Sequence, residues 1–74
     1  MTEEQRLRCA RVTVAVSAVT GSLAEVLPSM QDIRVALRVA LFLTDKFIED
    51  PNSKSIDYRE QVREMVMREM GFVN

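Results

Sequence analysis

Several residue types that small domains use for cross-linking or metal binding are scarce or absent from this chain. It has no histidine, no tryptophan and a single cysteine, Cys9. One cysteine excludes an intrachain disulfide, and without histidine there are too few soft ligands for a structural zinc site. A chain of this length buries only about 60% of the surface that its unfolded form exposes. We therefore expect its stability to depend on association with another chain.

The same absences exclude most catalytic chemistry. No histidine can act as a general base, and Cys9 has no histidine partner to activate it as a nucleophile. Gly21 stands alone, without the further glycines and the lysine of a phosphate-binding loop. Cys9 is interpreted as a small, buried apolar residue on a helix face. We predict that the protein is not an enzyme, with no catalytic residues and no metal or other cofactor.

Residues that break regular structure are also few: the chain has two glycines and two prolines. Strand-rich small domains need many turns, whereas helical ones do not. The composition therefore predicts an all-α fold, a small three-helix domain that occupies residues 1–74. Gly21 is expected either to bend or to end the first helix. The helices are predicted at about residues 3–27, 30–49 and 56–70.

The second and third predicted helices have recognisable ends. Pro51 ends the second, because the residue before a proline is pushed out of the α region. Apolar residues surround most of this helix, which is typical of a helix in the middle of an assembly. Either Ser55 or Asp57 can open the third helix, and Asp57 has Glu60 three positions later, the spacing of a capping box. Gly71 followed by Phe72 predicts a left-handed Schellman ending.

The stretch RLRCARVTVAVSAVTGSLAE, residues 6–25, fits several patterns. Its arginines followed by VTVAVSAV have the layout of a secretory signal, but Glu3 and Glu4 place acid in the basic region. The valines alternate as in a strand, yet no second strand is present to pair with. Its longest uncharged run, residues 12–24, is thirteen residues, and about 20 are needed to span a membrane. We therefore expect no membrane segment.

A helix accounts for more of these residues. Thr2 and Gln5 have capping-box spacing, and Glu3 and Glu4 suit the positive end of a helix dipole. Six residues then follow at intervals of 3, 4, 3, 4 and 3, the spacing of a heptad repeat. We call them the apolar seam: Cys9, Val12, Val16, Val19, Leu23 and Val26.

Three such helices carry more apolar surface than a monomer of this size can bury, so we expect an oligomeric helical bundle. The leading hypothesis is a small cytoplasmic protein-interaction module (an adaptor, regulator or inhibitor) that self-associates or docks on a larger protein. Methionine-rich ends suit such contacts because their side chains adapt to a partner groove. The expected partner interface comprises Val12, Val16, Val19, Leu23, Met65, Met67 and Phe72.

Two other hypotheses remain open. The first is a nucleic-acid-associated helical dimer whose basic patch would contact phosphates. A helix-turn-helix is disfavoured, since Pro28 falls inside the segment that would be the recognition helix. The second is a secreted peptide released after Ala24. The possible anion contacts are Arg8, Arg11, Arg34 and Arg38.

Overall fold

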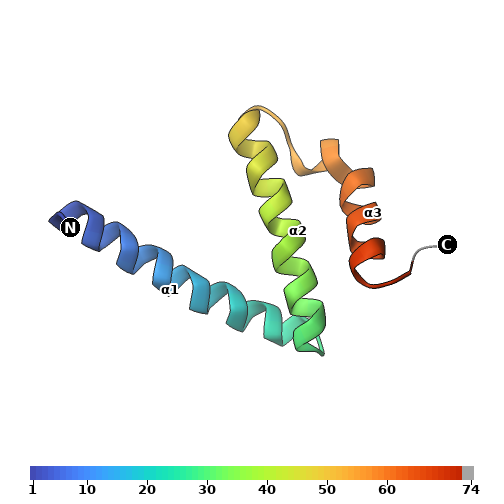
Figure 1. The fold of residues 1–74 in the computed structure, drawn as a ribbon, viewed down its shortest axis with the longest axis horizontal. Helices are drawn as coiled ribbons and strands as arrows, with labels where there is room; N and C mark the ends of the chain where they lie inside the picture. The colour runs from blue at the N-terminus through green and yellow to red at the C-terminus, as the bar shows by residue number, and fades with distance from the viewer. Residues whose placement is uncertain (73–74) are drawn as a thin grey trace. The chain divides into compact units, whose positions relative to one another are not determined.

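The computed structural model describes residues 1–72 and confirms the all-α prediction (Figure 1). Within that range it contains no strand. The elements are α1 (Glu3–Val26), α2 (Met30–Glu49), a short 3-10 helix η1 (Ser55–Tyr58) and α3 (Arg59–Glu69). The chain divides into two compact units, Met1–Met30 and Gln31–Asn74, and each is described by itself.

The first unit is essentially α1, and its beginning confirms the predicted capping box. The Gln5 N–H donates to Thr2 Oγ1 at 3.1 Å, and the Thr2 N–H donates to Gln5 Oε1 at 2.9 Å. These two bonds satisfy amide groups that a helix end otherwise leaves without partners. The valines that alternate in the sequence are helical, so the strand interpretation is wrong.

Gly21 does not end α1, which continues without a break to Val26. A glycine inside a helix costs only about 1 kcal/mol relative to alanine, which the surrounding helical turns offset. The helix ends where Leu27 becomes extended, with φ −106° and ψ 131°. Pro28 follows Leu27, and a residue before proline is driven toward this conformation.

The second unit is a helical hairpin in which α2 and α3 run side by side (Figure 1). Its buried residues within the described range, Ile33 and Val39, both come from α2 and are 3% and 5% exposed. At the loop end of the hairpin, the Tyr58 ring makes edge contacts with two phenylalanines of α2. The ring centroids lie 6.4 Å from Phe42 and 6.3 Å from Phe47. These aromatic contacts join the η1 turn to α2.

The start of α3 differs from the prediction. Residues 55–58 form a 3-10 turn, and the α-helix begins at Arg59 rather than near residue 56. Asp57 does not open α3: its Oδ2 accepts from the Lys54 N–H at 2.8 Å and so closes the preceding turn. The predicted Asp57–Glu60 capping box is therefore wrong. The tighter turn accompanies the packing of Tyr58 on the α2 phenylalanines, a contact that local spacing does not reveal.

The end of α3 confirms the predicted Schellman motif. Gly71 has a positive φ of 78°, the left-handed conformation that glycine adopts without a steric penalty. The Phe72 N–H donates to the Met67 carbonyl oxygen at 2.8 Å, and the Gly71 N–H donates to the Arg68 carbonyl oxygen at 3.1 Å. These are the two hydrogen bonds that define the motif.

Candidate interaction surfaces

The apolar seam runs along α1. None of the α1 residues is buried, and Cys9 is exposed, so its interpretation as a buried apolar residue is wrong for the described chain. Val12 and Val16 are each 60% exposed and Val26 is 77% exposed, while Leu23 is half-buried. On the opposite side of α1, Val14 is also exposed. A free helix of this composition leaves apolar area in water that a partner surface would remove.

Two threonines next to the seam already have hydrogen-bond partners inside α1. Thr13 Oγ1 donates to the Cys9 carbonyl oxygen and Thr20 Oγ1 donates to the Val16 carbonyl oxygen, both at 2.8 Å. Such back-bonding to the preceding turn satisfies the hydroxyl donor locally. A partner can therefore cover these side chains without leaving their donors unpaired, a cost of about 1–3 kcal/mol each when it occurs.

The length and composition of α1 also qualify it as a candidate membrane span, the one such helix in residues 1–72. None of the candidate window is buried, and it lies near the N-terminus, where a signal sequence passes the same test. The uncharged stretch of thirteen residues is about 20 Å long, whereas the hydrocarbon core of a bilayer is about 30 Å thick. Arg11 and Glu25 border that stretch, so a span would place both charges inside the hydrocarbon core.

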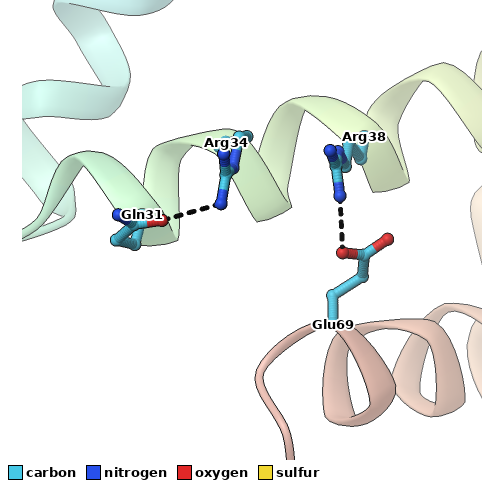
Figure 2. Close-up of polar contacts among 4 residues, drawn as sticks. All are labelled: Gln31, Arg34, Arg38 and Glu69. Carbon is cyan, nitrogen blue, oxygen red and sulfur yellow. Dashed lines mark hydrogen bonds and ion pairs between the residues drawn. The ribbon is translucent and has the colours of Figure 1, made fainter.

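The four arginines considered as anion contacts are divided between the two units. In the second unit, Arg38 Nη1 forms an ion pair with Glu69 Oε2 of α3 at 3.0 Å, and Arg34 Nη2 donates to Gln31 Oε1 at 2.8 Å (Figure 2). Within the described residues, Arg8 and Arg11 form no ion pair. The structure thus defines no single patch that contains all four. Sequence spacing did not identify Glu69 as the partner of Arg38, because the two residues are 31 positions apart.

The predicted interface residues at the end of the chain belong to the second unit. Met65 and Met67 are half-buried, whereas Phe72 is 62% exposed. Phe72 lines an open cavity of about 310 Å³ together with Met70 and Val35. Polar residues complete the lining, so this end of the hairpin is a mixed surface rather than an apolar groove.

Residues 1–72 contain no group of three or more histidine, cysteine or acidic side chains placed to hold a metal ion. Comparison with known proteins finds no family model, no curated protein and no solved structure that matches the chain. The candidate site is therefore defined by the surface of α1 itself.

Proposed function

We propose that this chain is a small non-enzymatic protein-interaction module whose docking element is α1. The observation that carries the proposal is a capped helix of 24 residues, none of them buried, with an apolar seam along its length. Full burial of an exposed valine or leucine contributes about 1.5–3 kcal/mol. The seam side chains are largely but not completely exposed, so covering the surface that remains contributes less than full burial. Each side chain then contributes on the order of 1 kcal/mol when a partner helix covers it.

The second unit supports this proposal because it is a folded hairpin to which the docking helix α1 is joined. Its helices are joined by the Tyr58 ring contacts and by the Arg38–Glu69 ion pair, so the hairpin has tertiary contacts of its own. In α1 the only hydrogen bonds described are local ones. A folded hairpin joined to an exposed helix suits an adaptor, regulator or inhibitor that acts by occupying a surface of another protein. We propose that the protein acts in the cytoplasm.

The test is a charge placed on the seam, compared with the same charge on the opposite face. Val16→Asp and Leu23→Asp bury a carboxylate in the interface and should abolish association. Val14→Asp is the matched control, because Val14 is 68% exposed and lies off the seam. Sedimentation velocity measures self-association, and affinity purification with mass spectrometry measures binding to a larger protein. Equal behaviour of Val16→Asp and Val14→Asp in both measurements would refute the proposal.

Membrane insertion of α1 is the second candidate function, favoured by its length and composition. The short uncharged stretch bounded by Arg11 and Glu25 argues against it. Flotation of the purified chain with phospholipid vesicles distinguishes the two. An integral segment stays with the vesicles in 1 M salt. At this salt concentration the Debye length is about 3 Å, so electrostatic attraction to lipid headgroups is screened. The interaction module stays in the soluble fraction.

The nucleic-acid hypothesis is less well supported. Arg38, one of its four proposed contacts, is already paired with Glu69. Binding of duplex DNA with an affinity that falls steeply with salt concentration would restore this hypothesis. Association that is insensitive to salt favours the apolar seam.

A further inference from the structure

We propose that α2 carries a second interaction surface, on which two copies of this chain pair with their α2 helices antiparallel. The inference goes beyond the proposed function, because it concerns α2 of the hairpin, whereas the docking element proposed above is α1. It is carried by an exposed apolar line along α2, by the symmetry of that line, and by two opposite charges on one of its edges.

Four large apolar side chains of α2 are exposed in the described chain. At about 100° per residue they lie within about 20° of one line that runs along the helix. The buried Val39 lies on the opposite side of α2, so these four side chains are not part of the hairpin core. We call them the α2 stripe: Met30, Leu37, Leu41 and Ile48.

The α2 stripe is symmetric about the level of Val39. Leu37 and Leu41 are two positions from Val39 on either side, and Met30 and Ile48 are nine positions from it. In an antiparallel pair centred on this level, each leucine lies opposite a leucine of the second copy, and Met30 lies opposite Ile48. A closed pair about a two-fold axis requires a surface that is complementary to itself. The α2 stripe meets this requirement along almost the whole of α2.

The charges beside the stripe are also complementary to themselves in this arrangement. Arg34 and Asp45 lie on the same edge of the stripe, about 40° and 60° from its centre. Antiparallel packing about a two-fold axis brings this edge of one copy against the same edge of the other. Arg34 is then level with Thr44 of the second copy and only about 1.5 Å along the helix from the level of Asp45. The symmetry makes the Arg34–Asp45 ion pair twice.

Both side chains are exposed and available for this contact. Among the described residues Asp45 has no ion-pair partner. Arg34 donates through Nη2 to Gln31 Oε1, and an arginine has further N–H donors. Arg34 and Asp45 are about 16 Å apart along one helix, so they do not pair within one chain. Arg38, farther out on the same edge, is neutralised by Glu69 (Figure 2).

Other occupants do not supply the same counter-charges. In a parallel pair the edge with Arg34 would face the other edge of the stripe, which holds Ala40 and Thr44. The apolar seam of α1 is not equivalent either, because residues 12–24 are uncharged and Glu25 lies on the opposite face of α1. Charge complementarity therefore selects a second copy of α2 in reverse orientation.

A charge swap tests this pairing, with sedimentation equilibrium as the measure of the Kd of self-association. Asp45→Arg sets arginine against Arg34 of the second copy and should weaken self-association at least about tenfold. Arg34→Asp combined with Asp45→Arg restores opposite charges between the copies and should return the Kd to within about threefold of wild type. The control Glu64→Arg makes the same change in charge at an exposed position of α3 and should leave the Kd unchanged.

A second variant tests the apolar part of the surface. Leu41→Asp places a carboxylate in the middle of the α2 stripe and should abolish self-association. Far-ultraviolet circular dichroism equal to that of wild type shows that the variant is still folded. This variant keeps the inference testable if the charge variants change the helix content.

Three outcomes would overturn the inference. The first is a double charge variant as weak as Asp45→Arg, because rescue requires Arg34 and Asp45 to meet between copies. The second is a wild-type chain that is monomeric at its highest soluble concentration, which leaves the proposed function to its own test by affinity purification. The third is a dimer that is lost in Val16→Asp but retained in Leu41→Asp. That result would make the α1 seam the self-association surface and support the proposed function.

Discussion

The contact of Tyr58 with two α2 rings gives a quantitative prediction for the stability of the hairpin. The Phe42–Tyr58 pair has an interplanar angle of 88° and the Phe47–Tyr58 pair one of 65°, both edge arrangements with centroids within the favourable range. Each such pair contributes about 0.5–1.5 kcal/mol beyond the area that it buries. Tyr58→Leu keeps an apolar side chain but removes both ring contacts. The expected loss in free energy of unfolding is therefore about 1–3 kcal/mol.

That loss is large for a domain of this size, whose core rarely supplies more than about 3–5 kcal/mol. Urea denaturation followed by far-ultraviolet circular dichroism measures it, at a protein concentration low enough that all variants are monomeric and association does not contribute. Leu41→Ala is the control: Leu41 is 63% exposed and outside the ring cluster, and its replacement should change stability by less than about 0.5 kcal/mol.

A double-mutant cycle with Phe47→Leu and Tyr58→Leu measures the interaction energy between the two rings. The expected coupling energy is about 0.5–1.5 kcal/mol. A coupling below about 0.3 kcal/mol, or a Tyr58→Leu chain as stable as wild type, would refute the argument that ring contacts join η1 to α2.

The two glycines give opposite predictions that thermal denaturation followed by circular dichroism can check. Gly71→Ala should destabilise the chain by about 1–2 kcal/mol, because Gly71 has a φ of 78° that an L side chain rarely adopts. Gly21→Ala should stabilise α1 by about 0.5–1 kcal/mol, since Gly21 is helical and a Cβ there would meet nothing within 4 Å. Gly21 also lies opposite the apolar seam, so Gly21→Ala should leave self-association unchanged. A weakened dimer would show that the interface lies on the Gly21 face and contradict the seam as docking surface.

The features that were predictable from the sequence are those whose causes lie within a few residues. The Thr2–Gln5 capping box spans four residues, and the Gly71 ending spans six. Pro28 and Pro51 act on the residue before them. These interactions depend on local spacing, so the ends of α1 and α2 were predicted to within one residue. The seam is likewise a periodic property of α1, although the pattern by itself does not identify what covers it.

The start of α3 shows where this local reasoning fails. Asp57 and Glu60 have the spacing of a capping box, but Asp57 instead accepts from the Lys54 N–H in the η1 turn. The turn brings Tyr58 against the rings of Phe42 and Phe47. A capping bond is worth about 1 kcal/mol, so two ring contacts are sufficient to override it.

The sequence by itself determined the helical class, the capped beginning of α1, the glycine ending of α3 and the seam, because each follows from hydrogen bonds or periodicity within one helix. Only the tertiary structure decided that Arg38 is paired with Glu69, that Tyr58 lies against two α2 rings, and which residues are buried. Arg38 and Glu69 are 31 positions apart, and their contact depends on how the loop after α2 directs α3 back along α2. Spacing along the sequence carries no information about this path of the chain, because packing between α2 and α3 determines the path.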